Sequence, residues 1–366
     1  DDEGRFQFTG FFQLTGGKLL SGQAQGQKSW SYQNFNCPCS IQNWEYVGVY
    51  EQGRGLQLDK ESLVGGQLNA KLTNAVSATA QVVARPRNNH SADYMPTLDW
   101  AYVSWKPSED FTLQLGRKRI PLYYYSDYLY IGYAYPWVRP APDVYGWPIF
   151  SYDGVTGLYT PALGNSDWTL NASVWRGRSQ DNNSAYWNSI YYGTKVSTKW
   201  DNITGTWASL SNGIVEGRLM FMNHQETTVQ LPGTASALVL SDQQSTRIRG
   251  VSFNVDYQNY ILRSELNQFK QRPGAANKFI YNYFLIGAGY KFGQFTPMLT
   301  ASRYMTKPSE GISREGRFTR SASVRWDFAK DLALKVQYDD SKDKSQYSYP
   351  FFGDSKLLSV SLQGVF

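Results

Sequence analysis

The chain has 366 residues, enough for one large domain or two ordinary ones, and a formal net charge of +6. No run of about 18 apolar residues occurs, which excludes a transmembrane helix. No Lys/Arg run of the type that binds nucleic acid occurs, which argues against nucleic-acid binding. With 27 Tyr, 19 Phe, 12 Trp and 32 Gly, the composition suits strands, turns and aromatic girdles, although a soluble β-sandwich array shares it.

The first half of the chain alternates between strand-like segments and connections. Apolar residues recur with the period of two that strands require, as at Phe6, Phe8 and Phe12. A long polar stretch, a tight turn at 73–75 and a loop at 85–97 separate the early segments. Strands are predicted at 5–16, 64–72, 76–82, 151–159, 167–177 and 203–210. Two more lie between them: one strand ends at residue 105, and the next begins at residue 111.

The second half continues the pattern. Residues 211–213 read Ser-Asn-Gly, a hairpin-turn signal, and short turns recur at 258–259 and 293–294. Strands are predicted from 215 and at 246–257, 260–270, 279–292, 295–305, 316–328, 332–340 and 356–366, which makes sixteen. Connections after odd-numbered strands are long or polar, and those after even-numbered strands are short. Transmembrane barrels alternate in this way, with long outer loops and short periplasmic turns.

The last strand has two distinct faces and runs to the final residue. Its even positions from Leu358 to Phe366 are apolar or glycine, whereas Ser359, Ser361 and Gln363 are polar. One face toward lipid and one toward a wet lumen predict a strand paired into a closed sheet. Aromatic residues also bracket the short turns, as at Trp105/Phe111, Tyr159/Trp168, Tyr257/Tyr260, Phe292/Phe295 and Trp326/Phe328. They predict an inner aromatic girdle.

Two segments leave the strand count open. Residues 44–50 and 190–196 each have enough apolar residues for another strand, and both together would make eighteen. Either placement would break the alternation of long and short connections. We therefore interpret both as ordered outer loops, with the long first outer loop at 17–61.

The chain resembles the trimeric porins of Gram-negative bacteria over its full length. The resemblance rests on the sixteen alternating segments, the long loops on one side, the 287–292 segment Gly-Ala-Gly-Tyr-Lys-Phe and the C-terminal Phe366. The expected fold is all-β, a 16-stranded antiparallel transmembrane β-barrel in which residues 1–366 form a single domain. The resemblance further implies an inward-folded third loop at 119–150 that constricts the pore, a homotrimer and the outer membrane as location.

The predicted third loop is unusually aromatic, and in this it departs from the acidic, glycine-rich loop of general porins. Residues 121–140 hold seven tyrosines and one tryptophan. Two roles stay open for them: a wedge packed against the barrel wall, or a lining that stacks on solute. Tyrosine hydroxyls such as that of Tyr124 could offer hydrogen bonds to a sugar or a carboxylate. Prolines at 121, 136, 140, 142 and 148 would stiffen the loop.

Strand parity places more basic than acidic side chains toward the lumen, and rings of Arg and Lys select anions. Acids two positions away would neutralise part of this charge, in the pairs Glu216/Arg218, Arg263/Glu265 and Arg325/Asp327. Arginines facing Asp127 or Asp143 would create a transverse field. Outward charges such as Arg117 would instead bind lipid and lipopolysaccharide phosphates at the outer rim. The residues predicted to line the pore or contact solute are Arg85, Lys118, Arg119, Tyr124, Asp127, Arg139, Asp143, Arg218, Arg263, Arg317, Arg325 and Lys335.

The chain has few of the cysteine and histidine residues that metal, redox and catalytic sites commonly use. Cys37 and Cys39 are the two cysteines, and His90 and His224 the two histidines. Zinc normally takes about four ligands, so a short disulfide between the two cysteines, or two thiols in an exposed loop, is favoured over a metal or redox pair. We expect no metal and no cofactor.

The sequence therefore predicts an outer-membrane porin for passive diffusion of small hydrophilic solutes, with a preference for anions or small carboxylates and no enzymatic activity. The alternatives are a receptor or adhesin that uses the first loop, and a barrel enzyme such as a lipase or protease.

Overall fold

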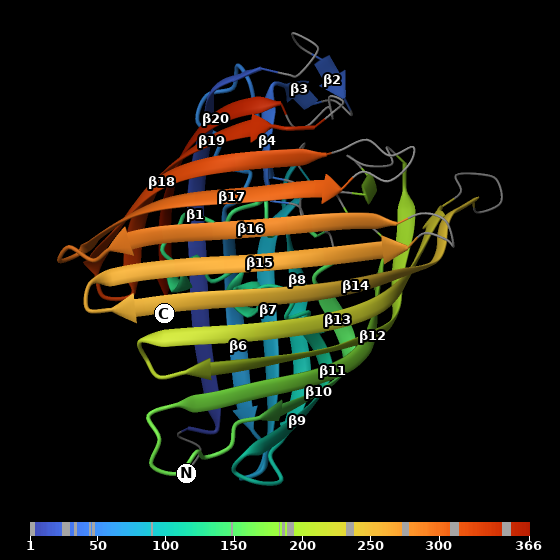
Figure 1. The fold of residues 1–366 in the computed structure, drawn as a ribbon, viewed down its shortest axis with the longest axis vertical. Helices are drawn as coiled ribbons and strands as arrows, with labels where there is room; N and C mark the ends of the chain where they lie inside the picture. Colours follow the sequence, from blue (N-terminus) through green and yellow to red (C-terminus); the bar gives the residue numbers. More distant parts are fainter. Residues whose placement is uncertain are drawn as a thin grey trace.

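A computed structural model shows the chain as a closed β-barrel (Figure 1). The residues that the structure describes are 4–23, 30–32, 35–43, 45, 48–88, 91–147, 149–182, 184, 187–188, 194–231, 238–272, 278–307, 315–345 and 353–366. Within them, no helix has the length and apolar character needed to cross a membrane.

The barrel strands follow one another around the ring in chain order, each antiparallel to its neighbours, and β1 closes the ring by pairing with both β6 and β20. Their bounds are β1 (Phe6–Gln23), β6 (Leu63–Lys71), β7 (Val76–Asn88), β8 (Ser91–Trp105), β9 (Phe111–Arg119), β10 (Ser151–Tyr159), β11 (Thr169–Asp181), β12 (Val196–Ser211), β13 (Val215–Gln230), β14 (Leu238–Tyr257), β15 (Tyr260–Arg272), β16 (Phe279–Tyr290), β17 (Phe295–Lys307), β18 (Gly316–Ala329), β19 (Leu332–Asp343) and β20 (Asp354–Val365). The predicted 16-stranded antiparallel barrel is confirmed.

Several strands extend further outward than predicted. β7 and β8 meet across residues 89–90, so the predicted loop at 85–97 is wrong. β1 likewise continues to Gln23, past the predicted start of the first loop at residue 17. The extra residues are paired, for example Pro86 with Tyr94. Periodicity misses these ends because, beyond the lipid, both faces of a strand meet water and the apolar alternation fades.

The two segments that left the strand count open do not enlarge the barrel. β4 (Cys39–Asn43) and β5 (Gly48–Glu51) pair with each other in a separate two-stranded sheet, as do β2 (Trp30–Tyr32) and β3 (Phe35–Cys37). Of the segment 44–50, residues 45 and 48–50 are therefore part of the first outer loop, as predicted, and residues 44, 46 and 47 lie outside the described residues. Residues 190–193 lie outside the described residues, and β12 begins at Val196.

Each strand shows the two faces that its sequence predicts, and β20 is the clearest case. Ser359 and Ser361 are fully buried toward the lumen, whereas Leu358 and Val360 are each 37% exposed on the outside. An outward apolar surface of this kind is stable only against lipid.

The barrel closes on the last residue of the chain. The Gly10 amide donates to the Phe366 carbonyl at 2.6 Å, and the Phe366 amide donates to the Gly10 carbonyl at 2.9 Å. A Cβ atom on Gly10 would come within 2.2 Å of the Phe366 ring, so glycine lets this ring lie across the strand. Near the short turns, the rings of Phe295 and Trp326 stack at 5.8 Å, in line with the predicted girdle.

Candidate functional site: the third loop inside the barrel

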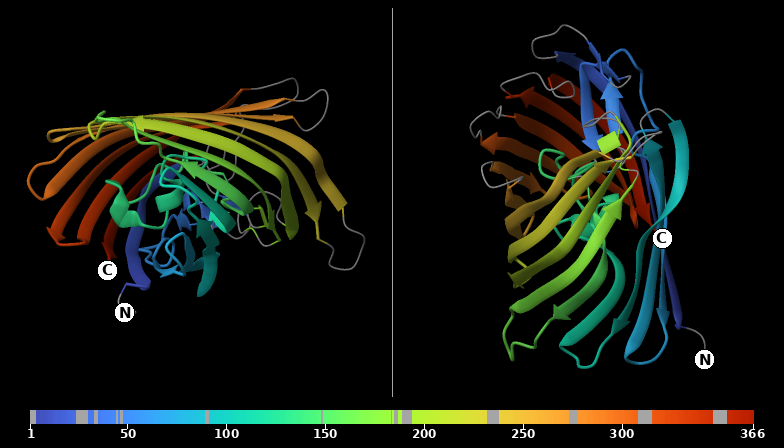
Figure 2. Two further views of the ribbon diagram at one scale, coloured as in Figure 1. Left: turned by 90° about the horizontal axis from the view of Figure 1, so that it is seen from below. Right: turned by 90° about the vertical axis from the view of Figure 1, so that its right-hand side faces the viewer.

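The third loop, residues 120–150 between β9 and β10, folds into the barrel (Figure 2). It contains two short 3-10 helices, η1 (Ser126–Tyr128) and η2 (Gly132–Ala134). The Ser126 hydroxyl accepts a hydrogen bond from the Tyr123 amide at 2.9 Å and so holds the backbone that leads into η1. The predicted inward fold of this loop is confirmed.

The loop is an apolar wedge against one wall. The rings of Tyr123 and Tyr145 lie 4.7 Å apart, and the Trp147 ring meets the Phe269 ring of β15 edge-on at 5.0 Å. The wall side chains in this cluster come from β11–β17, and they are Trp175, Trp200, Ile203, Met220, Met222, Ile248, Phe269, Tyr283, Leu285 and Met298. The structure thus supports the wedge role for most of the loop's aromatic residues, because they pack on the protein instead of facing solvent.

Polar side chains of β18–β20 hold the loop backbone on the next part of the wall. The Lys335 ammonium donates to the carbonyls of Gly132 at 2.7 Å and Trp137 at 2.9 Å. Arg325 donates to the Tyr133 carbonyl at 2.6 Å. Two glutamine side chains also hold Val138. The Gln337 side-chain oxygen accepts from the Val138 backbone N–H at 2.9 Å, and the Gln363 side-chain NH₂ donates to the Val138 carbonyl at 3.0 Å.

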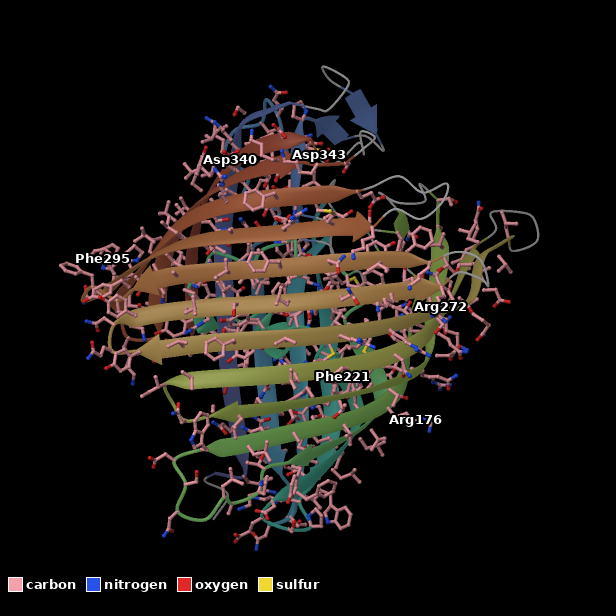
Figure 3. The ribbon with its side chains drawn as sticks, viewed as in Figure 1. Arg176, Phe221, Arg272, Phe295, Asp340 and Asp343 are labelled. Atoms are coloured by element: carbon pink, nitrogen blue, oxygen red, sulfur yellow. The ribbon has the colours of Figure 1, made fainter. Side chains whose placement is uncertain are left out.

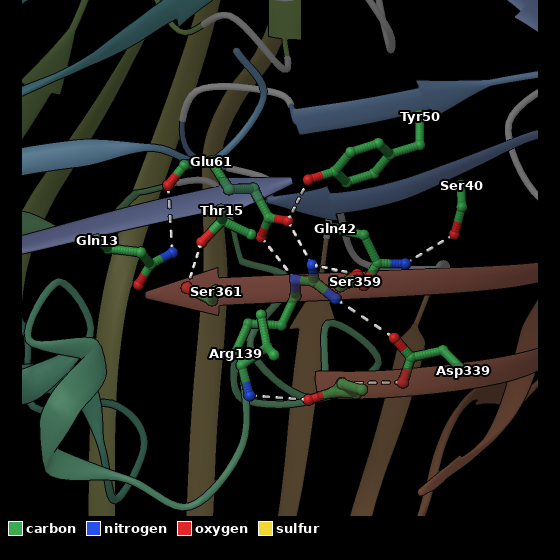
Figure 4. A network of polar contacts seen from close by, with 12 residues as sticks. Gln13, Thr15, Ser40, Gln42, Tyr50, Glu61, Arg139, Asp339, Ser359 and Ser361 are labelled. Atoms are coloured by element: carbon green, nitrogen blue, oxygen red, sulfur yellow. Dashed lines mark hydrogen bonds and ion pairs between the residues drawn. The ribbon is translucent and has the colours of Figure 1, made fainter. Parts of the chain in front are cut away.

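Arg139 joins the third loop, the first loop and the wall in one network (Figure 4). Its guanidinium lies 2.6 Å from Glu61 and 3.3 Å from Asp339, and it donates to the Ser359 hydroxyl at 2.8 Å. The Arg139 side chain is 5% exposed. Burial disfavours its charge, but the Glu61 carboxylate outweighs burial and keeps the pKa of Arg139 above its usual value. Glu61 also accepts from the Tyr50 hydroxyl at 2.8 Å.

A second ionic cluster links the loops to the outer ends of β7 and β9. Glu45 of the first loop lies 3.0 Å from Arg85 and 3.1 Å from Arg119, and it accepts a hydrogen bond from Tyr130. Arg119 also pairs with Asp99 at 3.1 Å. Burial raises the pKa of Glu45, but the positive charges of Arg119 and Arg85 outweigh it and hold that pKa below its usual value.

The other predicted charges are also paired near the loop. Arg317 bonds to Asp143, which accepts from the Ser302 hydroxyl at 2.7 Å. Arg218 donates to the Pro121 carbonyl at 2.9 Å. Toward the short-turn ends of β13–β15, the Tyr124 hydroxyl donates to Glu216 at 2.5 Å and Arg263 pairs with Asp256 at 2.8 Å.

These contacts correct the predicted placement of four of the nine basic residues. They were expected on the open pore surface, but Arg119, Arg139, Arg317 and Lys335 are buried, because the inserted loop packs against the wall there. Of the predicted neutralising pairs, Arg325 does meet Asp327, at 2.7 Å. Arg263 pairs with Asp256 instead of Glu265, because the cross-strand neighbour is nearer. Sequence reasoning missed Glu45, Glu61 and Asp99, which lie in a loop or beside a strand bulge where parity gives no signal.

The wall formed by β6–β9 differs from the others. Its inward polar side chains bond to one another: Gln81 to Gln67 at 3.0 Å, Thr79 to Asn69 at 2.9 Å and Gln114 to Ser104 at 3.2 Å. We call these six residues the polar ladder. Within the described part of the chain, none of them is hydrogen-bonded to the third loop.

Charged side chains flank the polar ladder. Lys118 remains partly exposed above the Tyr102 ring, 5.1 Å from its centroid, and Lys71 is exposed near the short turns. Asp127 and Tyr128 of the third loop are also accessible, Tyr128 at 50%. On this side of the barrel, Gln67, Asn69 and Ser104 of the polar ladder remain partly exposed.

The remaining predictions concern cysteines and metals. Cys39 is disulfide-bonded, and Cys37 is the one other cysteine of the chain; the Cys37 side chain lies outside the described residues. His90 lies outside them as well, whereas His224 stacks on Trp200 at 3.8 Å. In the described residues, no group of three or more His, Cys, Asp and Glu is placed to hold a metal ion.

No protein-family model and no curated protein matches the sequence. Solved structures do resemble its fold. The outer membrane channel DcaP of Acinetobacter baumannii is 10% identical, with a TM-score of 0.64 over 99% of this chain and 97% of that chain. The anion-selective porin of Comamonas acidovorans is 13% identical, with a TM-score of 0.58 over 99% of both chains. The trimer form of OmpT of Vibrio cholerae is 9% identical, with a TM-score of 0.61 over 99% of both. At these identities the likeness shows the fold alone.

Proposed function

We propose, from its 16-stranded outer-membrane porin fold, that this chain is a porin of a Gram-negative outer membrane through which small hydrophilic solutes diffuse passively. The observation that carries the proposal is the asymmetric filling of the barrel. The third loop is packed and bonded to the walls of β11–β20, whereas toward β6–β9 it packs through Tyr130 on Leu63 and Val83 and makes no hydrogen bond to the polar ladder within the described residues. A barrel of this size encloses a water channel unless it is filled.

The passage runs between the accessible edge of the third loop and the polar ladder. Amide and hydroxyl groups line the ladder side, and Asp127 lines the loop side. Polar groups that already bond to one another exchange easily with water, so a hydrated solute passes without meeting an unsatisfied site. This lining favours diffusion over tight binding.

We further propose a modest preference for anions or small carboxylates. Lys118 and Lys71 are the accessible cations beside the polar ladder, and neither has an ion pair within the described residues. Asp127 opposes them from the loop and provides the other side of a transverse field. Most other basic groups in the barrel are paired or bonded to loop carbonyls, so the expected preference is small. The similarity in fold to an anion-selective porin agrees with this proposal.

Single-channel recording in a planar bilayer with a tenfold KCl gradient tests both proposals. Stable ohmic steps are expected, with a reversal potential that shows chloride preference. Folded protein without channel activity would refute the porin function and favour a receptor or enzyme. Steps with cation preference would refute only the anion preference. Liposome swelling with sugars and acids of equal size would show whether solutes are sorted by charge as well as size.

We also propose that the porin is a homotrimer. The outer faces of β1, β6 and β7 combine small residues with exposed apolar ones, such as Gly66 beside Phe8, which is 65% exposed, and Leu68, which is 43% exposed. Close barrel-to-barrel contact would bury this surface. The similarity in fold to a trimeric outer membrane protein agrees with it. Native mass spectrometry in detergent measures the state, and a monomer mass alone would refute it.

A further inference from the structure

The outward face of β9–β14 carries a groove with a volume of about 690 Å³. Its apolar part is formed by Leu113, Val155, Val174 and Phe221, whose side chains point away from the lumen. Gly157 has no side chain to fill the space between the Phe111 and Val174 side chains. The groove is therefore a lipid-facing depression separate from the pore.

Three arginines line the outer end of this groove: Arg176 of β11 and Arg247 and Arg249 of β14. Register places Arg176 opposite Thr204, Thr204 opposite Asn223, and Asn223 opposite Arg247, so a polar row crosses four strands. Arg249 lies two residues further along β14, toward the short-turn end, opposite Phe221. Arg176 and Phe221 are both labelled in Figure 3.

All three guanidinium groups are exposed, and within the described residues none of them forms an ion pair. Arg117 provides the contrast on the same outer surface. It bonds to Asp153 through two parallel contacts of 2.9 and 3.0 Å, so its charge is already matched. The groove thus carries three positive charges that no carboxylate pairs with among the described residues.

The depth of the arginines identifies the layer of the membrane that they meet. Along β14, Arg247 lies about ten residues from Tyr257 at the short-turn end, which is ~33 Å along the strand. At the usual strand tilt of about 40° this corresponds to ~25 Å of height, the thickness of the apolar band of such barrels. Arg176 and Arg247 therefore lie at the outer boundary of the hydrocarbon, where lipid phosphates are found.

We propose that this groove binds one phosphorylated acyl glycolipid of the outer leaflet, of the lipid A type that anchors lipopolysaccharide. An acyl chain lies along Val174 and Phe221, and the phosphates lie between Arg176, Arg247 and Arg249. Guanidinium groups bind phosphate oxygens in pairs with good geometry, and the arginines have no competing carboxylate. The site requires only that the barrel lie in an outer membrane.

Native mass spectrometry of the detergent-solubilised porin, titrated with bis-phosphorylated lipid A, tests the proposal. The variant Arg247→Ala/Arg249→Ala is expected to bind this lipid about tenfold more weakly or worse. The matched control is Arg303→Ala/Arg320→Ala, which removes two exposed outward arginines of β17 and β18 and should bind like the wild type. Equal affinity of the two variants would overturn the proposal.

Two further measurements separate the contribution of the arginine charges to lipid binding from that of the shape of the groove. Thr206→Trp fills the apolar part of the groove without changing a charge, and it should also weaken binding. Lipid A from which the phosphates have been removed, and phosphatidylethanolamine, should bind the wild type and the arginine variant equally weakly. Wild-type affinity for the dephosphorylated lipid, or undiminished binding by the Trp variant, would overturn the proposal. Channel conductance should be unchanged in every variant, so the result is independent of the pore.

Discussion

The walls formed by β18–β20 and by β6–β9 both present polar side chains to the lumen, but they use them differently. On β18–β20, Lys335, Gln337 and Gln363 bond to the third-loop backbone. On β6–β9, the polar ladder bonds to itself. A side chain whose hydrogen bonds are satisfied within the wall has nothing left to hold a loop with, and water stays beside it. The first wall therefore anchors the loop, and the second borders the passage.

The largest effect is expected from Arg139→Ala, which removes the centre of the anchored side. Glu61 and Asp339 would remain buried without their shared cation, which typically costs about 3–5 kcal/mol. Urea unfolding and amide hydrogen exchange of residues 120–147 should show lower stability and a loosened loop, and conductance should become noisier. Arg117→Ala is the control, because its exposed pair with Asp153 should contribute within about 0.5 kcal/mol. Equal effects of the two variants would contradict the anchoring role.

Lys335→Met should have a smaller effect of the same kind. Methionine keeps the length of the side chain, but it leaves the carbonyls of Gly132 and Trp137 without their donor. Such a loss costs about 1–3 kcal/mol. Faster amide exchange confined to residues 130–139 is the expected result. Gln81→Met in the polar ladder is the comparison, and it should leave exchange of the loop unchanged, since Gln81 bonds to Gln67 instead.

Acid should weaken the link between the first loop and the outer ends of β7 and β9 only at low pH. The folded pKa of Glu45 lies below its ordinary value of 4.5, so its contribution is present above that value and is lost as pH falls through the lower folded pKa. Protease cleavage of the first loop between pH 7 and 3 measures this. Glu45→Gln should already be cleaved faster at neutral pH, with a flatter acid response. Parallel curves for the two proteins would argue against Glu45 as the titrating group.

On the open side, Lys118→Glu should change selectivity and leave stability nearly unaltered. The side chain is partly exposed and contacts Gln114 and the Tyr102 ring, so little packing is lost. Reversal of an accessible charge beside the passage should move the zero-current potential toward cations. Lys335→Met provides the control for position, because a cation covered by the loop should affect selectivity less. A larger shift from Lys335→Met would show that the passage lies on the anchored side.

The sequence contains a signal for part of the wall surface on which the third loop packs. Residues 219–222 read Leu-Met-Phe-Met and residues 283–286 read Tyr-Phe-Leu-Ile, so both faces of β13 and β16 are apolar there. An apolar residue facing the lumen has no partner in a water-filled pore. Such runs indicate that something covers the inner wall, and here the third loop does.

The sequence by itself determined the barrel. Strand alternation, turn residues and the aromatic residues beside the turns are local signals, and lipid on one face with water on the other makes them strict across the membrane. They placed sixteen strands, the short turns and the inward or outward direction of most side chains.

Only the tertiary structure decided what the inward charges do. The pairing of Arg139 with Glu61 and Asp339, or of Glu45 with Arg85 and Arg119, joins residues from separate loops and strands. Parity says that a side chain faces the lumen, but not whether a loop covers it there. Electrostatic pairing depends on distances between segments far apart in the chain, and these distances exist only once the barrel has closed around its third loop.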